Sequence, residues 1–172
     1  MAALKSATKV NVTHLDASKA AVQWARQNVA LSGVESNDRR VRWIVDNCTT
    51  FLNREIKRGN TYDGLIFDPP AFGRFNGKMW KIKKDFHALI EIIPKLLNTT
   101  ASTPKFVILS CHDEKFPKER IKELLQDSLK GCGIMGGRFE MFDMILRASL
   151  IDEHGLKGKD LPCGSCVRWI VT

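Results

Sequence analysis

The 172-residue chain has no apolar run approaching the ~18 residues that a membrane-spanning helix needs, which excludes an ordinary transmembrane segment. It is also short of negative charge, because 19 Asp and Glu oppose 27 Lys and Arg and leave a net charge of +8. Such a basic chain suits an anionic partner such as nucleic acid, and the positive excess lies in the first two thirds of the sequence. With 44% hydrophobic and 27% charged residues, the composition is that of a globular domain.

A secretory signal is missing too, since Met1–Lys5 is followed by neither an apolar core nor a cleavage site. We expect a cytoplasmic protein with five reduced cysteines, or an organellar one if a further segment precedes Met1. Cys163 and Cys166 have the spacing of metal ligands. A zinc site needs two further ligands, however, so a glycine-containing turn before the last strand is the simpler interpretation, and we predict no metal.

Short β-branched runs alternate with longer helical periodicities, as in α/β proteins with a parallel sheet. Strands are predicted, in chain order, over Lys9–Asp16, Val41–Val45, Tyr62–Phe67 and Lys105–Ser110. The first predicted helix begins after its cap Ser18 and stops at Gly33, and the second runs through Phe51 and ends at Gly59. Two more helices are predicted over Lys81–Leu97, where Pro94 bends or ends the helix, and over Pro117–Lys130. Residues 68–80 and 131–137 are expected to be loops. Phe139–Leu146 and Val167–Val171 are predicted to form an antiparallel pair at one edge of the sheet.

Two sets of buried residues are expected from the same patterns. The first helix should bury an apolar face that includes Val22, Trp24, Val29 and Leu31. The strand ending at Phe67 is nearly all apolar at its end, which predicts burial on both faces. No repeat or linker divides the chain, so we expect one domain over residues 1–172.

Polar residues directly follow the predicted strands, and ligands of open α/β sheets gather at the carboxyl ends of strands. Asp16 offers two acceptors, which suits the two hydroxyls of a ribose, although it could instead cap the next helix. Asp46 or Asn47 could bind an adenine edge or cap the helix that follows.

The Asp68-Pro69-Pro70 segment is more specific. Its two prolines remove two backbone donors and restrict two φ angles, which leaves the strand-end carbonyl and Asp68 to face a planar substrate. The alternative is a rigid turn with a solvated acid.

Aromatic and cationic side chains are interleaved after this turn, at Phe72, Arg74, Lys78 and Trp80. Aromatic rings offer stacking surfaces for bases while cations contact phosphates, so the segment suits RNA. The alternative is that Phe72 and Trp80 anchor the core.

Cys111 directly follows the strand ending at Ser110. Its thiol could act as a nucleophile if His112, Lys115 or a following helix N-terminus lowered its pKa. A free cysteine after a buried strand can equally be a small packed hydrophobe.

These motifs resemble the class I S-adenosylmethionine-dependent methyltransferases, and within them the branch of bacterial large-subunit rRNA cytosine-5 methyltransferases. The resemblance is carried by residues 12–28, 41–47, 62–74 and 106–112, and is most specific in the DPPAFG segment with the MWKI that follows. It implies a Rossmann-like sheet with helices on both faces and the antiparallel pair at its C-terminal end.

The resemblance also implies functional roles. S-adenosylmethionine would be the cofactor, with its ribose at Asp16 and Ala17, its adenine at Asp46 and Asn47, and Asp68 beside it. The substrate would be a base in RNA, with cytosine C5 favoured. Asp68, Pro69 and Pro70 would line the target pocket, and Cys111 would attack the ring carbon next to the one that is methylated. Phe72, Arg74, Lys78 and Trp80 would bind the RNA.

The sequence departs from this family at its start, because the family's first strand and its Gly-rich cofactor turn have no counterpart here. We therefore expect a partial domain, from a truncated product or gene-model fragment, that lacks the central strand of the sheet. Two alternatives to an RNA methyltransferase stay open: a non-catalytic RNA-binding remnant, and a methyltransferase of a protein or small molecule. The sequence does not define the oligomeric state.

Overall fold

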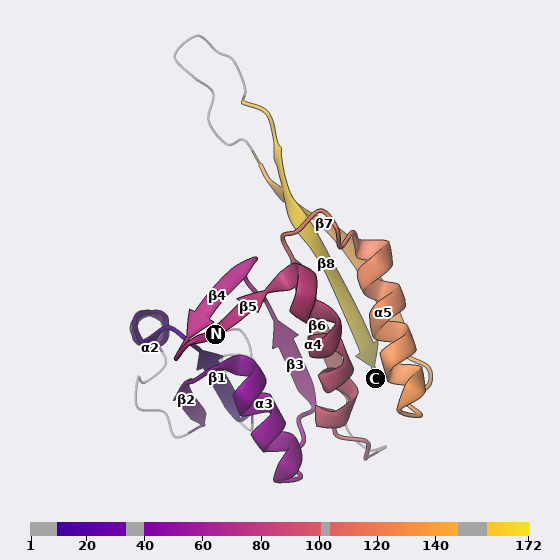
Figure 1. Ribbon diagram of the computed structural model, residues 1–172, viewed down its shortest axis with the longest axis horizontal. Coiled ribbons are helices and arrows are strands. Elements are labelled where there is room, and N and C mark those ends of the chain that lie inside the picture. Colours follow the sequence, from indigo (N-terminus) through magenta and orange to yellow (C-terminus); the bar gives the residue numbers. More distant parts are fainter. Residues whose placement is uncertain (1–9, 34–39, 101–103, 148–157) are drawn as a thin grey trace. The chain divides into compact units, whose positions relative to one another are not determined.

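The computed structural model describes residues 10–33, 40–100, 104–147 and 158–172. Their contacts divide the chain into two compact units, Met1–Arg54 with Arg74–Lys78, and Glu55–Gly73 with Met79–Thr172. Figure 1 labels the helices and strands of both units. Among the described helices, none is long and apolar enough to cross a membrane. A single domain over residues 1–172 stays a prediction.

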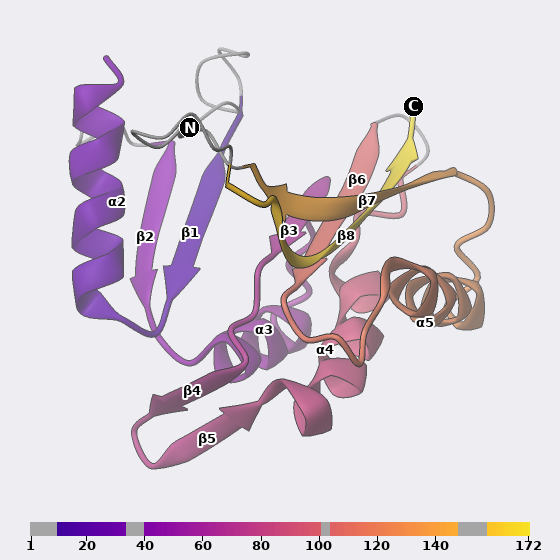
Figure 2. The same ribbon diagram turned by 90° about the horizontal axis from the view of Figure 1, so that it is seen from above.

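The first unit is built on two parallel strands, β1 (Val12–Asp16) and β2 (Val41–Val45). Helix α2 (Lys19–Leu31) lies beside these strands and buries Val22 and Val29 (Figure 2). Ser18 caps α2 as predicted, because its hydroxyl accepts a hydrogen bond from the Ala21 amide at 3.2 Å. Helix α3 (Cys48–Lys57) follows β2.

The second unit contains a four-stranded mixed sheet, in which two parallel strands are extended by an antiparallel pair. Its strand order is β3 (Gly64–Phe67), β6 (Lys105–Cys111), β8 (Leu161–Val171) and β7 (Arg138–Leu146). β3 and β6 are parallel, whereas β8 runs antiparallel to both β6 and β7. The predicted antiparallel pair at the sheet edge is therefore confirmed, and the α/β class with it.

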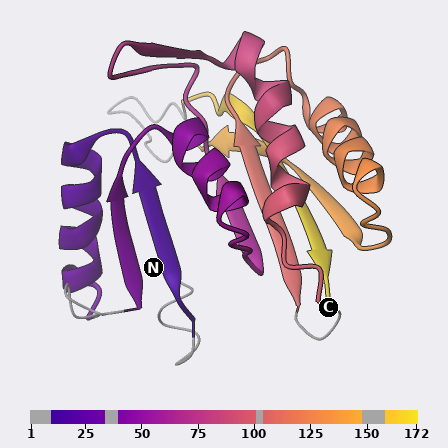
Figure 3. The same cartoon turned by 60° about the horizontal axis from the view of Figure 1, so that its bottom comes forward.

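Two helices cover one face of this sheet, α4 (Ile82–Leu96) and α5 (Lys118–Gly131), which lie side by side in Figure 3. Val107, Leu109 and Val167 point to this face and are fully buried. Pro94 lies in the last turn of α4, which ends two residues later. Pro117 is the N-cap of α5, as expected of a proline at a helix start.

Trp169 is the largest fully buried side chain of the second unit. Its indole Nε1–H donates to the Gly136 carbonyl at 3.1 Å. A Cβ at Gly137 (φ +84°) would lie 2.3 Å from Trp169 Nε1, so only glycine lets the 132–137 loop pass this closely. Residues 132–137 are a loop, as predicted, whereas Gly131 is the last residue of α5.

Three predictions of burial are wrong. Trp24 and Leu31 of α2 are 68% and 86% exposed, because a sheet of two strands covers only the stripe through Val22 and Val29. Ile66 of β3 is 68% exposed. Leu65 points to the face covered by helices and is buried, whereas Ile66 points to the opposite face.

Residues 68–80, predicted to be a loop, contain most of a β-hairpin made of β4 (Phe72–Phe75) and β5 (Lys78–Lys81). The turn residues Asn76 and Gly77 have φ values of +46° and +76°, as a type I′ turn requires. The loop prediction is wrong because an Asn-Gly turn flanked by strand-forming aromatic residues favours a hairpin.

The described strands form three separate hydrogen-bonded sheets, β1-β2, β4-β5 and β3-β6-β8-β7. β1 and β3 thus belong to different sheets. Helices on both sheet faces and the loss of the family's first strand stay predictions.

Candidate active site

Two acidic residues meet at the carboxyl end of the β1-β2 sheet. Asp16 ends β1 and Asp46 follows β2, and the Asp46 amide donates to the Asp16 carbonyl at 3.1 Å. Partial burial raises the pKa of the nearby Cys48 thiol, and the negative charges of Asp16 and Asp46 raise it further. Both carboxylates therefore lie near the Cys48 thiol, at the end of the sheet where ligands of open α/β sheets gather.

Local contacts already occupy part of this acidic pair. Asp16 Oδ1 accepts from the Ser18 amide at 2.6 Å, and Asp46 pairs with Arg54. Asn47 caps α3, because its Oδ1 accepts from the Thr50 amide at 2.9 Å and from the Thr50 hydroxyl at 3.0 Å. The capping alternative is thus confirmed for Asn47.

The remaining groups of this strand end fit a nucleoside. The second carboxylate oxygen of Asp16 is an acceptor of the kind that ribose hydroxyls need, and the side-chain amide nitrogen of Asn47 is a donor suited to an adenine ring nitrogen. Ala17, half-buried between Asp16 and the cap, adds no bulk. The donor and acceptor set therefore agrees with the nucleoside part of S-adenosylmethionine.

A second polar cluster lies at the carboxyl ends of the parallel strands β3 and β6. Asp68 Oδ1 accepts a hydrogen bond from the Ser110 hydroxyl at 2.5 Å and lies 3.3 Å from His112 Nε2. The Asp68 side chain is 69% exposed and that of His112 47%, so the carboxylate stays accessible. The side chains that contact Asp68 at this strand end are thus Ser110 and His112, not the predicted Cys111.

Cys111 points the other way. Its side chain is fully buried, on the same helix-covered face as Val107 and Leu109, because alternate residues of a strand share a face. Burial raises the pKa of its thiol, and the thiol lies 4.0 Å from the Asp113 carbonyl, which can accept its S–H. These features favour the packing role that the sequence left open, and a nucleophilic role stays a prediction.

The two prolines after Asp68 are held differently. Pro69 is buried and anchors the turn, whereas Pro70 is exposed. The Pro70 carbonyl, expected to face a substrate, accepts a hydrogen bond from Trp80 Nε1 at 2.7 Å. Trp80 therefore holds the turn in place.

The β4-β5 hairpin has two faces with different roles. A Cβ on Gly73 would lie 3.6 Å from Trp80 Cβ, so these residues share one face, together with Lys78, whose ammonium donates to Thr50 at 3.1 Å. Alternation then assigns four exposed side chains to the opposite face. These side chains, the outer hairpin face, are Phe72 (71% exposed), Arg74, Met79 (54% exposed) and Lys81. Phe72 and Arg74 thus lie on a different face of the hairpin from Lys78 and Trp80, although all four are predicted to bind RNA.

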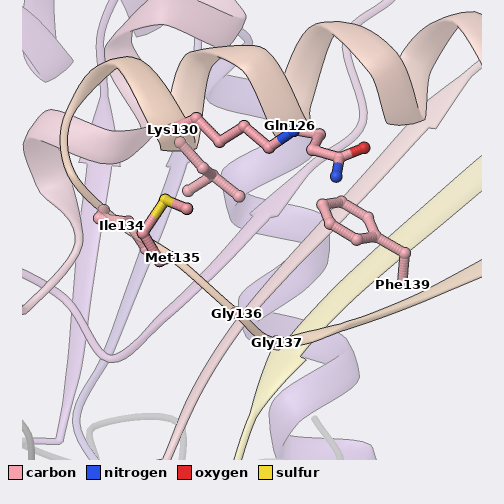
Figure 4. Close-up of a pocket in the computed structure, with 8 residues that line it drawn as sticks. Gln126, Lys130, Ile134, Met135, Gly136, Gly137 and Phe139 are labelled. Carbon is pink, nitrogen blue, oxygen red and sulfur yellow. The ribbon is translucent and has the colours of Figure 1, made fainter.

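A small pocket of about 130 Å³ lies between α5 and the start of β7 (Figure 4). It is lined by Gln126, Leu129, Lys130, Ile134, Met135, Gly136, Gly137 and Phe139. Arg138 pairs with Ile170, which pairs with Phe106, so this pocket lies at the amino end of β6. It is therefore separate from the Asp68 cluster at the carboxyl end. Among the described residues, no group of three potential ligands could hold a metal ion, Cys163 and Cys166 included.

Sequence comparison places this chain near bacterial rRNA methyltransferases. It is 31% identical to ribosomal RNA large subunit methyltransferase K/L of Shewanella pealeana over 122 residues, which are 69% of this chain and 15% of that protein. The K/L protein of Pseudoalteromonas atlantica is 33% identical over 91 residues, or 51% of this chain and 12% of that one. No family model matches the chain.

Structural comparison agrees. The S-adenosylmethionine-dependent methyltransferase of Agrobacterium tumefaciens aligns with a TM-score of 0.77 and 30% identity, covering 98% of this chain and 50% of that one. The precorrin 8W decarboxylase of Methanobacterium thermoautotrophicum, 9% identical, shares the fold with a TM-score of 0.58 over 94% of this chain and 70% of that one.

The chain therefore has the sequence and fold of a class I S-adenosylmethionine-dependent methyltransferase, as its motifs predicted. More particularly, it is a distant homologue of the ribosomal RNA large subunit methyltransferases K/L, and spans about a seventh of their length. Membership of the cytosine-5 branch stays a prediction.

Proposed function

We propose that this chain transfers a methyl group from S-adenosylmethionine to a base in RNA. The observation that carries the proposal is the exposed Asp68 carboxylate at the end of β3, held by Ser110 and His112 in a chain with a methyltransferase fold. This arrangement presents a hydrogen-bond acceptor at the sheet end where ligands of this fold class bind.

The Asp16 and Asp46 strand end would hold the cofactor. Asp16 would accept from the ribose hydroxyls through the oxygen that Ser18 does not engage, and Asn47 would donate to the adenine. When bound, the cofactor supplies an electrophilic methyl group on a sulfonium. The charge of Asp46 is paired with Arg54, and its carboxylate would orient the adenine edge.

The Asp68 turn would hold the target base. A carboxylate accepts hydrogen bonds from the amino and imino groups of a base, so Asp68 would set the in-plane orientation of the ring. Pro69 and the Trp80 contact to Pro70 keep the turn rigid while the base binds. Such positioning of two reactants is a large source of catalysis on its own.

RNA is favoured over other acceptors by the outer hairpin face and by charge. Phe72 and Met79 present apolar surface for stacking beside the cationic Arg74 and Lys81, a combination typical of single-stranded nucleic acid sites. The net charge of +8 supports the same partner, and the K/L relatives are named for their action on rRNA.

The proposal is tested by calorimetry of the full chain with S-adenosylmethionine and by transfer of a labelled methyl group to RNA. We expect both binding and transfer, and Asp16→Ala should weaken cofactor binding about tenfold because it removes a charged hydrogen-bond acceptor. Asp127→Ala, at an exposed position of α5, is the matched control and should bind normally. RNA binding without cofactor binding would indicate the non-catalytic remnant. Cofactor binding without transfer to RNA at low salt, where phosphate contacts are strongest, would indicate a protein or small-molecule acceptor.

The chemical route is tested at Cys111. A buried thiol with a raised pKa is poorly suited to attack a base, so we expect Cys111→Ala to retain most transfer activity and to lower the free energy of unfolding by about 1 kcal/mol. Denaturing gels with labelled RNA should show no protein–RNA adduct in either form. Loss of transfer together with loss of an adduct would establish covalent attack at cytosine, and Cys132→Ala, at an exposed cysteine, controls for thiol loss in general.

A further inference from the structure

The Asp68 carboxylate has two neighbours on β6 and the loop that follows it. Ser110 Oγ lies 2.5 Å from Asp68 Oδ1 and 3.2 Å from the Phe67 carbonyl. A hydroxyl has a single hydrogen, and the charged acceptor at the shorter distance is the stronger one. Ser110 therefore donates to Asp68.

His112 touches an acceptor at each ring nitrogen. Nδ1 lies 2.5 Å from the Cys163 carbonyl, and Nε2 lies 3.3 Å from Asp68 Oδ1. A carbonyl only accepts, so Nδ1 carries a hydrogen in this arrangement. The contact from Nε2 to the Asp68 carboxylate is then a hydrogen bond only when Nε2 is protonated as well, that is, in the imidazolium form.

Backbone geometry brings the Cys163 carbonyl to this ring. Cys111 of β6 pairs with Ser165 of β8, and Gly164 beside it has a φ of +136°. A Cβ at Gly164 would lie 2.3 Å from the Cys111 carbonyl oxygen and 3.1 Å from His112 Cα. Only glycine therefore lets β8 approach closely enough for residue 163 to bind His112.

The other charges around His112 are engaged elsewhere or are weak. Burial raises the pKa of the Cys166 thiol. The positive charge of Arg168 lowers this pKa, and the negative charge of Asp68 raises it. Arg168 Nε donates to Glu140 at 2.8 Å, and Lys83 lies 3.7 Å from Asp113. Besides Asp68, the titratable and charged groups of the packed elements include Cys166 and Arg168 of β8, Glu140 of β7, Asp113 after β6, Lys83 of α4, and Asp143 of β7 with its partner Lys118 of α5. Of these described groups, Asp68 is the one that the ring contacts.

We propose that Ser110 and His112 are positioning residues for Asp68, and that His112 holds the carboxylate only in its doubly protonated form. This inference rests on the proposed function, because it assigns Asp68 to the target base. The Cys163 carbonyl engages the Nδ1 hydrogen, so the contact with Asp68 requires a second hydrogen on Nε2. Methyl transfer should therefore depend on the donor at position 112 as well as on Ser110.

Methyl transfer by three variants tests this dependence. His112→Ala should lower transfer about tenfold, because it removes a donor to a charged acceptor. His112→Gln keeps an N–H donor and should restore most of the transfer that His112→Ala loses. Ser110→Ala should also lower transfer, since it removes the other donor to the same oxygen. His87→Ala, at an exposed position of α4, is the control and should transfer at the wild-type rate.

Ring nitrogen NMR of the full chain tests the contact without activity. The ring should carry hydrogens on both Nδ1 and Nε2, and Asp68→Asn should shift the Nε2 signal because it replaces the carboxylate that accepts from this nitrogen. A ring with one protonated nitrogen, or an Nε2 signal that Asp68→Asn leaves unmoved, would overturn the inference. If no variant transfers methyl groups, the proposed function fails, and the NMR result still decides whether His112 holds Asp68.

Discussion

Asp68→Asn is expected to reduce the rate of methyl transfer about 100-fold, because misplacing one reactant by a small distance is enough for a loss of that size. Ser110 and His112 both approach the same carboxylate oxygen, and asparagine keeps its shape but loses the charge that attracts the two donors. Asparagine also replaces one carboxylate oxygen, an acceptor for the base, with an amide NH2 group, which is a donor. Single-turnover transfer of a labelled methyl group to RNA, at saturating cofactor, measures the effect directly.

The fold should be unaffected by this change, since the Asp68 side chain is 69% exposed, and the urea midpoint of Asp68→Asn should match the wild type. Asp127→Asn, at an exposed position of α5, should retain full activity. A wild-type rate in Asp68→Asn would remove Asp68 from the site, and with it the observation on which the RNA methyltransferase proposal depends.

Glu55→Ala is expected to lower the free energy of unfolding by about 2–4 kcal/mol, because it leaves several donors without their acceptor. Glu55 is fully buried and its carboxylate accepts from the Tyr62 hydroxyl at 2.5 Å, Asn60 Nδ2 at 3.0 Å and Arg58 Nη1 at 3.1 Å. These bonds tie the end of α3 to the chain that enters β3. Against a typical domain stability of about 5–15 kcal/mol, the loss is large.

Urea denaturation followed by circular dichroism measures this loss. Glu91→Ala, at an exposed position of α4, removes the same charge without the network and should change stability little. Glu55→Gln keeps one acceptor oxygen and should fall between the two. Equal midpoints for Glu55→Ala and Glu91→Ala would show that the network does not stabilise the fold.

Much of the element order could be predicted from local signals. β2 has the predicted bounds, and α5 begins one residue after the predicted proline. The Ser18 cap and the Gly33 stop of α2 are also short-range features that a few neighbouring residues determine. The acids at strand ends follow from the same reasoning, because a strand and its last polar residue are adjacent in sequence.

The rest depends on contacts between distant residues. Ile66 is exposed because no described helix covers its face of the sheet. The apolar pattern of the strand alone does not predict which face is covered. The Glu55 network needs the turn after α3 to fold back, and the His112 contact needs β8, 51 residues away in sequence, to pass beside it. The hairpin was missed although its Asn-Gly turn was readable, because the aromatic and basic residues around it suggested a binding loop.

The glycine at position 164 gives the Cys-Gly-Ser-Cys segment a steric explanation. A motif search would assign this tetrapeptide to half of a zinc knuckle or to a redox pair. In the fold it lies inside β8, not in the turn that its glycine predicted, and the missing side chain is what allows two neighbouring backbones to touch. The spacing of the two sulfurs is then a by-product of close strand contact, so the same tetrapeptide in a related chain would report a shared backbone path rather than a shared metal.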